Sequence, residues 1–224
     1  MKRVAIIQAR MGSTRLPNKM LIDFNGYPII KWVYHRVLKA KKIDQIIFAI
    51  PDKKEDDKLF SYLKSMDALV YRGSDYDVVE RYYYAAKSFK ASHVIRICGD
   101  NPLICGSEID RLINFFDLNI CDYAYNHIPK NNLYPDGLGA EICSIEVLKE
   151  IYLKSKSKLH REHVFNFIWD NANKYTIKTF DPPEPLSFPD VKLDIDTLQD
   201  LIYLSKKNFK IDMTAMEVIN TMRK

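Results

Sequence analysis

Three cationic side chains stand close together near the start of the chain: Arg10, Arg15 and Lys19. They follow residues 4–7, a short continuous apolar run of the kind found in a strand buried on both faces. The residues between the cations include glycine, serine, threonine and proline, which end a strand and favour a tight loop. Backbone N–H groups in such a loop bind anions, and the side chains add about three positive charges. The pattern predicts a phosphate site suited to a nucleoside triphosphate.

The alternative is that these cations are ordinary surface residues, because lysine and arginine are common in the chain. Chance readily places one cation after a strand, but it places all three in one loop far less readily. The loop matches neither G-x-x-x-x-G-K-[ST] nor G-x-G-x-x-G, so the P-loop and dinucleotide fingerprints are both absent. A phosphate site of another type is therefore predicted.

Carboxylates form the second set of residues that could do chemistry. Asp100 follows the apolar residues 93–98 and precedes Asn-Pro, where an aspartate commonly only forms a turn. Asp194 and Asp196 lie two apart on a segment expected to be extended, so both side chains would point the same way. Carboxylates crowded together without a basic neighbour in the sequence are costly unless a cation is bound. The set predicts Asp100, Asp194 and Asp196 as oxygen ligands for Mg²⁺.

The elements that must hold these residues alternate along the chain. Apolar periodicity predicts strands at 4–7, 44–50, 68–71, 93–98, 140–145, 175–180 and 191–195. It predicts helices at 28–40, 55–65, 77–89, 107–116, 146–154 and 161–171, with further helices opening at Thr197 and Thr214. Strands alternating with helices of about ten residues indicate parallel βαβ units. We therefore expect an α/β, Rossmann-like fold with a mostly parallel sheet and helices on both faces.

Ligands bind beyond the carboxyl ends of the strands in such sheets, so the cationic loop and Asp100 are expected to open onto one crevice. The alternation breaks at residues 126–139, which hold two prolines, two glycines, three asparagines and few apolar anchors. They predict a long loop or an arm. With no internal repeat and no linker, residues 1–224 are predicted to form a single domain with an insertion at about residues 126–141.

The composition is that of an ordinary globular protein: 224 residues, 47% hydrophobic and 28% charged, with a formal net charge of +5. No dense basic run occurs, so nucleic-acid binding is not expected. The longest apolar runs hold four or five residues and are too short to cross a membrane. The four cysteines lack C-x-x-C spacing, which argues against a zinc site and favours reduced thiols. We expect a cytoplasmic protein.

Residues 8–19, reading QARMGSTRLPNK, resemble the signature loop of the cytidylyltransferases that make CMP-activated acidic sugars, the CMP-Kdo and CMP-acylneuraminate synthetases. The resemblance is greatest to their relatives in the spore-coat polysaccharide biosynthesis group. It continues in the family's order through GSDYDVVERY at 73–82, GDNPLI at 99–104, YPDGLGAE at 134–141, HREHV at 160–164 and DIDTLQDL at 194–201. It implies a fold of the nucleotide-diphospho-sugar transferase type.

The resemblance also implies a role for each matching residue. Arg10, Arg15 and Lys19 would act catalytically on the triphosphate, and Asp100 and Asp196, with Asp194, would hold Mg²⁺. Contacts to the nucleotide and the sugar would come from Gln8, Ala9, Gly12, Ser13, Gly73, Ser74, Asp77, Arg81, Asp136, Glu141 and Arg161. Gly139 departs from the pattern, because relatives often carry an aspartate there, and the departure bears on how the acceptor is held.

The segment at about residues 126–141 is similar to arms that cross to a second subunit in this group, which implies a homodimer with a protruding dimerisation arm. His160 and His163 lie three apart on a predicted helix and could bind zinc, but no third ligand is evident. We expect instead that Arg161 and Glu162 face the acceptor or a neighbouring subunit.

The function implied is transfer of CMP from CTP to an acidic, nonulosonic or Kdo-like sugar, with release of pyrophosphate, for surface polysaccharide or glycan biosynthesis. Two alternatives stay open. One is a nucleotidyltransferase that uses another nucleoside triphosphate or a sugar 1-phosphate, and the other is a glycosyltransferase-like enzyme that binds a nucleotide sugar. A catalytically silent binding partner is a further hypothesis, against which the intact cations and carboxylates argue. No general base is evident in the sequence.

Overall fold

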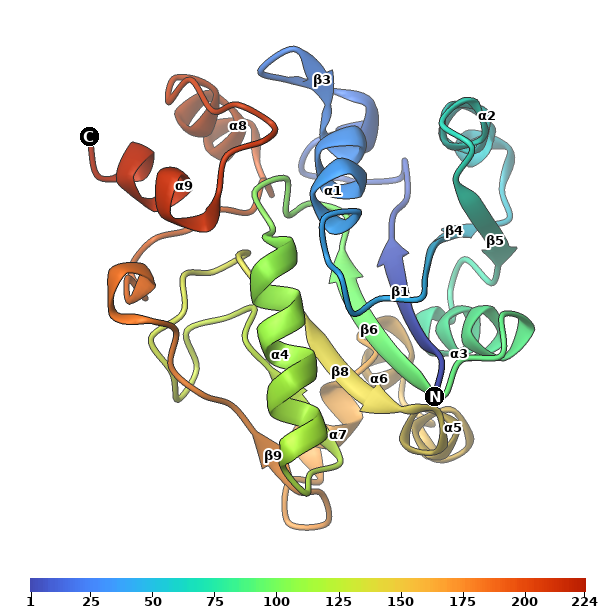
Figure 1. The fold of residues 1–224 in the computed structure, drawn as a ribbon. Coiled ribbons are helices and arrows are strands. Elements are labelled where there is room, and N and C mark those ends of the chain that lie inside the picture. The colour runs from blue at the N-terminus through green and yellow to red at the C-terminus, as the bar shows by residue number, and fades with distance from the viewer.

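The computed structural model describes residues 1–224 and is built around one seven-stranded sheet (Figure 1). In spatial order the strands are β5 (Leu69–Gly73), β4 (Gln45–Pro51), β1 (Arg3–Gln8), β6 (His93–Cys98), β8 (Glu141–Ser144), β7 (Tyr123–Tyr125) and β9 (Ile177–Lys178). β1 is parallel to β4 and β6, β4 is parallel to β5, and β7 is parallel to β9. Only β8 runs antiparallel to its neighbours. The predicted mostly parallel α/β sheet is confirmed.

Helices cover both faces of the sheet, as predicted (Figure 1). Side chains of α1 (Ile29–Val37), α2 (Asp57–Ser65) and α4 (Gly106–Leu118) share one buried cluster with alternate residues of β1. The other residues of β1 pack in a second cluster with α3 (Val78–Ser88), α5 (Ile145–Lys154) and α7 (Asn166–Asp170). This alternation is the two-residue period of a strand buried on both faces. No helix of the chain has the length and apolar character needed to cross a membrane.

A third buried cluster joins the C-terminal helices α8 (Leu198–Ser205) and α9 (Ala215–Met222) to α1 and to a short hairpin of β2 (Asp23–Phe24) and β3 (Tyr27–Pro28). In Figure 1 these two helices, in red, lie beyond the sheet on the side of α1. Each begins at a threonine with a capping box, in which the hydroxyl and a carboxylate three residues on both bond the backbone. Both begin where the sequence predicts.

The predicted helix at 161–171 is broken into two. α6 (Lys158–Glu162) ends before Val164 and Phe165, and α7 begins after them. Both of these side chains are buried in the second cluster. The chain leaves the helix at His163, whose backbone is extended with φ −119° and ψ 103°.

Two predicted strands are also reduced. Of residues 175–180, only β9 pairs with the sheet. Residues 191–195 form a single bridge between Lys192 and Asp136 instead of a strand of the sheet. This segment is held by a backbone bond at each end: Asp136 N–H donates to the Val191 carbonyl at 2.9 Å, and Ile195 N–H donates to the Asp100 carbonyl at 2.9 Å.

The predicted protruding arm is not observed, because residues 126–139 fold back onto their own chain. Tyr134 and Leu138 are fully buried in the third cluster. The Tyr134 hydroxyl donates to the carboxylate of Glu108 on α4 at 2.8 Å. Asn126 is also fully buried and donates to the Glu108 carbonyl at 3.0 Å. Tyr134 and Leu138 thus anchor this segment to the core, although its composition predicted few apolar anchors.

Candidate active site

A cavity of about 360 Å³ lies at the carboxyl ends of β1 and β6. Its walls come from segments that are distant in the sequence: the loop after β1, the turn after β6, the residue before Thr197 and the end of α6. It is lined by Gln8, Ala9, Arg10, Ser13, Thr14, Arg15, Lys19, Met20, Arg96, Cys98, Gly99, Asp100, Glu162, His163 and Asp196. The prediction that the cationic loop and Asp100 open onto one crevice is confirmed.

The cationic loop is fixed by contacts beneath it. Met11 N–H donates to Asp56 Oδ1 at 2.8 Å, and Asp56 is fully buried. Burial raises the pKa of that carboxyl. Asn18 takes the left-handed conformation with φ 59°, which asparagine tolerates better than most residues, and a 3₁₀ turn over Lys19–Leu21 follows. The turn places Lys19 inward, where it is only 5% exposed.

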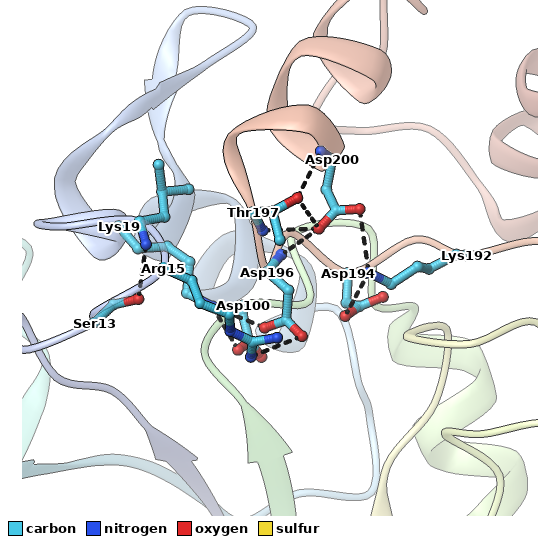
Figure 2. A network of polar contacts seen from close by, with 10 residues as sticks. Ser13, Arg15, Lys19, Asp100, Lys192, Asp194, Asp196, Thr197 and Asp200 are labelled. Carbon is cyan, nitrogen blue, oxygen red and sulfur yellow. Dashed lines mark hydrogen bonds and ion pairs between the residues drawn. The ribbon is translucent and has the colours of Figure 1, made fainter.

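Lys19, Arg15, Asp100 and Asp196 form one ion cluster inside the cavity (Figure 2). Lys19 Nζ lies 2.8 Å from Asp100 Oδ2 and 3.3 Å from Asp196 Oδ1. Arg15 Nη2 lies 3.0 Å from Asp196 Oδ2. The cluster brings together the loop after β1, the turn after β6 and the segment before α8. Cations and carboxylates therefore meet at one point, as the predicted phosphate and metal chemistry requires.

Backbone contacts hold the two carboxylates in place. Gly99 allows the turn after β6 to pass close to β1, because a Cβ there would lie 2.5 Å from a backbone oxygen of that strand. The Asp100 carbonyl accepts from Ile195 N–H, which sets the next segment beside the turn. Asp196 N–H donates to Asp200 Oδ2 at 3.0 Å, at the start of α8. The register of these bonds places Asp196 opposite Asp100.

Asp194 pairs with Lys192 and does not line this cavity, and the three predicted metal ligands do not form one set (Figure 2). It lines a separate cavity with Lys192 and Asp200. Lys192 Nζ is 3.6 Å from Asp194 Oδ2 and 3.2 Å from Asp200 Oδ1. Burial and then the nearby Asp136 raise the pKa of Asp194 to about 6. The expectation of no basic neighbour was wrong, because Lys192 is only two residues away.

Asp100 and Asp196 have the chemistry that Mg²⁺ requires. Their oxygens converge on a single ammonium group, that of Lys19, so two hard oxygen donors face one centre of positive charge. Mg²⁺ commonly binds through one or two carboxylates plus substrate phosphates and keeps several waters. No group of three or more histidine, cysteine, aspartate or glutamate side chains is arranged to hold an ion. Two carboxylates would thus leave the other coordination positions to phosphate and water.

The cavity is also lined by Arg96, which the sequence did not assign to the site. Glu141 is its cross-strand partner on β8, and the Glu141 carboxylate accepts from Arg96 Nη1 and from the Tyr123 hydroxyl. Burial alone would raise the pKa of Glu141, but Arg96, His127 and these hydrogen bonds lower it overall. Glu141 therefore stays ionised beneath the cavity and holds the guanidinium of Arg96 in place.

Asp77 and Arg161, both predicted as substrate contacts, bind each other instead of lining the cavity. Arg161 Nη1 lies 2.9 Å from Asp77 Oδ2. Asp77 also caps α3 by accepting from Glu80 N–H at 2.8 Å. The ion pair ties α6 to the start of α3, and the end of α6 carries Glu162 and His163 into the cavity wall. Arg161 thus does not line the cavity itself but positions the end of α6, which does.

Gly73, Ser74 and Arg81 form a separate packed group at the end of β5. Arg81 is buried and donates to the Ser74 carbonyl. Its Nε and Nη2 are buried and have no partner in the protein. The zinc hypothesis gains no support, because His160 Nε2 pairs with Asp170 at 2.7 Å while His163 lines the cavity.

The cavity brings together some of the predicted residues and not others. It is lined by Gln8, Ala9, Arg10, Ser13, Arg15, Lys19, Asp100 and Asp196. Outside its walls lie Gly12, Gly73, Ser74, Asp77, Arg81, Asp136, Glu141, Arg161 and Asp194. Two-residue alternation along β6 could have identified Arg96, because it shares a face with Cys98. Nothing in the sequence links the end of α6 to the end of β6.

Comparison with known proteins identifies relatives along the whole chain. A family model described as cytidylyltransferase matches residues 4–219. An uncharacterized protein of Methanocaldococcus jannaschii is 36% identical over 227 residues, which cover 100% of this chain and 91% of that protein. The spore coat polysaccharide biosynthesis protein SpsF of Bacillus subtilis is 29% identical, with 98% and 93% covered. A 3-deoxy-manno-octulosonate cytidylyltransferase of Chloroherpeton thalassium is 35% identical over 113 residues, which cover 50% of this chain and 45% of that enzyme.

Solved structures share the fold. A cytidylyltransferase from Leptospira borgpetersenii has a TM-score of 0.89 at 27% identity and covers 100% of this chain and 94% of its own. A CMP:2-keto-3-deoxy-manno-octonic acid synthetase complexed with CTP has a TM-score of 0.70 at 20% identity, with 92% and 98% covered. The match to the family model extends over nearly the whole chain and includes every residue of the ion cluster. The chain belongs to the cytidylyltransferase family.

Proposed function

We propose that the chain transfers CMP from CTP to an acidic sugar of the nonulosonic or Kdo-like class, for surface polysaccharide or glycan biosynthesis. The observation that carries the proposal is the convergence of Arg15 and Lys19 with Asp100 and Asp196 in one cavity. The choice of base is supported by the structural neighbour complexed with CTP. The choice of pathway is supported by the SpsF and 3-deoxy-manno-octulosonate cytidylyltransferase relatives.

In the proposed reaction an acceptor oxygen attacks the α-phosphorus of CTP. A new oxygen–phosphorus bond forms while the bond to the bridging β-phosphate oxygen breaks, and pyrophosphate leaves with that electron pair. Arg10, Arg15 and Lys19 neutralise the negative charge that develops on pyrophosphate. Holding both substrates in one cavity supplies orientation, and the acceptor proton is released to water.

Mg²⁺ is the proposed cofactor, and Asp100 and Asp196 are the residues that would hold it. When bound, the ion supplies Lewis-acid stabilisation of the charge on the phosphate oxygens. The backbone bond between Ile195 and Asp100 fixes the segment that carries Asp196 beside the turn that carries Asp100, which preorganises the pair.

Arg96 supports an acidic acceptor. It lines the cavity, and only its Nη1 binds a protein group, the carboxylate of Glu141. A guanidinium carries five N–H donors in a planar fork that matches a carboxylate. The Nε of Arg96 is buried without a partner, so the Nη donors left unpaired are the ones offered to a ligand, and they suit the carboxylate of an acidic sugar better than the hydroxyls of a neutral one.

Pyrophosphate release tests the proposal. The protein is incubated with CTP, Mg²⁺ and each of a panel of acidic sugars, with neutral sugars of matched size as controls. We expect release only with CTP and an acidic sugar, and a thermal shift larger for CTP than for GTP, UTP or ATP. Release with a sugar 1-phosphate in place of the acidic sugar would favour the alternative nucleotidyltransferase. A folded protein that releases no pyrophosphate with any pair contradicts the proposal.

A further inference from the structure

Lys19 occupies the place between two carboxylates that a divalent cation would need. Its Nζ contacts both Asp100 and Asp196, at 2.8 and 3.3 Å. The side chain is only 7% exposed, so these carboxylates, and not bulk water, solvate the ammonium. A charge buried to this degree is stable only when it is paired, and the same holds for the carboxylates that face it. Lys19 and the two carboxylates therefore depend on one another in the ligand-free protein.

The charges of the cluster balance before any substrate binds. Asp100 and Asp196 contribute two negative charges, and Lys19 and Arg15 contribute two positive ones. A divalent ion alone would meet carboxylates that are already neutralised. A triphosphate alone, with about four negative charges, would draw the cations away and leave the carboxylates facing each other unpaired. When both ligands bind, the metal offsets the two carboxylates, and Lys19 and Arg15 offset part of the triphosphate charge.

Arg15 and Lys19 differ in how freely they can exchange partners. The Arg15 side chain is 64% exposed and contacts only Asp196, so it can leave the cluster at little cost. Lys19 contacts both carboxylates from within the cavity. Lys19 is thus the group that a metal must displace.

We propose that Lys19 is the resident counter-ion of the Asp100–Asp196 pair and that it excludes a divalent metal until a triphosphate draws its ammonium away. The inference rests on the proposed function for the identity of the triphosphate, but its first test needs no nucleotide. Each ligand removes an obstacle to the other, so metal and nucleotide bind with positive coupling.

Mn²⁺ is the probe, because electron paramagnetic resonance distinguishes its free and bound forms. Without nucleotide, wild type and Lys19→Arg should bind Mn²⁺ weakly. Lys19→Met should bind it at least about tenfold more tightly, because two unpaired carboxylates then face one point. Adding Asp196→Asn to Lys19→Met should abolish the gain. Lys192→Met is the matched control, because Lys192 pairs with other carboxylates, and its Mn²⁺ affinity should stay within about twofold of wild type.

Equal Mn²⁺ affinity in wild type and Lys19→Met overturns the inference. A gain in Lys19→Met that Asp196→Asn does not abolish overturns it as well, because the metal would then bind at another site. Thermal unfolding checks that Lys19→Met folds, and Lys19→Gln replaces it if it does not.

A second measurement tests the coupling. CTP, corrected for the Mn²⁺ that it binds free in solution, should tighten Mn²⁺ binding to wild type by about tenfold or more, and by much less in Lys19→Met and Lys19→Gln. A CTP effect of equal size in wild type and Lys19→Gln counts against the inference. Failure of every sugar to give turnover would leave the nucleotide-free Mn²⁺ result unaffected, so the two proposals can fail separately.

Discussion

Individual side chains at the ends of β1 and β6 determine which steps the site can perform. Arg15 is largely exposed, and Asp100 lies in a turn whose backbone is fixed by neighbouring bonds. Neither side chain is part of a buried apolar cluster. Substituting Arg15 or Asp100 should therefore change the activity of the enzyme without unfolding it.

Arg15→Ala and Asp100→Ala should each lower kcat at least about 100-fold, because each removes a charge that faces the reacting phosphates. The free energy of unfolding should change by no more than about 1 kcal/mol for Arg15→Ala, whose ion pair is exposed to solvent. Pyrophosphate release measures the first effect and urea unfolding the second. Loss of folding in either variant would mean that these residues are structural.

Asp194 should make stability depend on pH. Its pKa is raised from 3.8 to about 6, chiefly by burial, so the folded state binds its proton more tightly than the unfolded state does. Between these pH values the folded protein holds more protons, and stability falls as pH rises. The full cost, roughly 3 kcal/mol, is present above pH 6 and absent below pH 3.8.

Asp194→Asn should therefore raise the free energy of unfolding at pH 8 and change it little at pH 4. Urea unfolding in the presence of a chelator measures both values. Asp190→Asn, at an exposed aspartate lining the same small cavity, is the control and should show no such difference. An equal effect of Asp194→Asn at the two pH values would contradict the prediction.

At the scale of elements, the position of α6 depends on one ion pair. Arg161→Ala frees the end of α6, which carries Glu162 and His163 in the cavity wall. We expect KM for the sugar to rise about fivefold, because a partly exposed ion pair contributes up to about 1 kcal/mol. Binding of CTP to the ion cluster should not change.

Asp77→Asn provides the matched variant for this prediction. Asparagine still caps α3 but cannot pair with Arg161 as a charge, so it should reproduce the KM change without destabilising the helix. Steady-state kinetics with each substrate varied in turn measure the effect. A rise in KM for CTP alone would place Arg161 on the nucleotide side.

The loop at residues 126–139 explains the glycine at position 139, where the resembled group often has an aspartate. A Cβ at Gly139 would lie 2.2 Å from Asn126 Oδ1 and 2.3 Å from the Asn126 carbonyl. Asn126 Oδ1 accepts from Ala140 N–H at 2.9 Å, so it cannot move without losing a buried hydrogen bond. Gly139→Ala should lower the free energy of unfolding by roughly 3 kcal/mol. Urea denaturation tests this, and an unchanged midpoint would mean that the loop adjusts freely.

At the scale of the whole molecule, much of the fold could be predicted from local periodicity. Residues 4–7 and 93–98 alternate between the two faces of the sheet, and the helices between the strands have clear apolar stripes. Parallel strands end at one edge, so the cationic loop and Asp100 could be placed together without coordinates.

The remaining features depend on contacts between distant segments, which no local pattern contains. The break between α6 and α7 accompanies the packing of Val164 and Phe165 into the second cluster, whose other members come from distant elements. The folding back of residues 126–139 follows from the bond between Tyr134 and Glu108. The separation of Asp194 from Asp196 follows from the way that Lys192 and the third cluster hold their segment.

The homodimer stays a prediction, now without the protruding arm that suggested it. Light scattering of the purified chain should give a mass about twice the 26.2 kDa of one chain. A mass equal to a single chain at all concentrations tested would exclude a stable dimer.

The hydrogen bond from Ile195 to the Asp100 carbonyl has a consequence for the order of events during synthesis. Lys19 and Asp196 are 177 residues apart, so a nascent chain carries the cationic loop and Asp100 long before it acquires the second carboxylate. A ribosome-bound or C-terminally clipped chain that stops short of Asp196 therefore leaves Lys19 with only half of its anionic partners. The ion cluster is therefore complete only after residue 196 has been made and its segment has folded against the turn after β6.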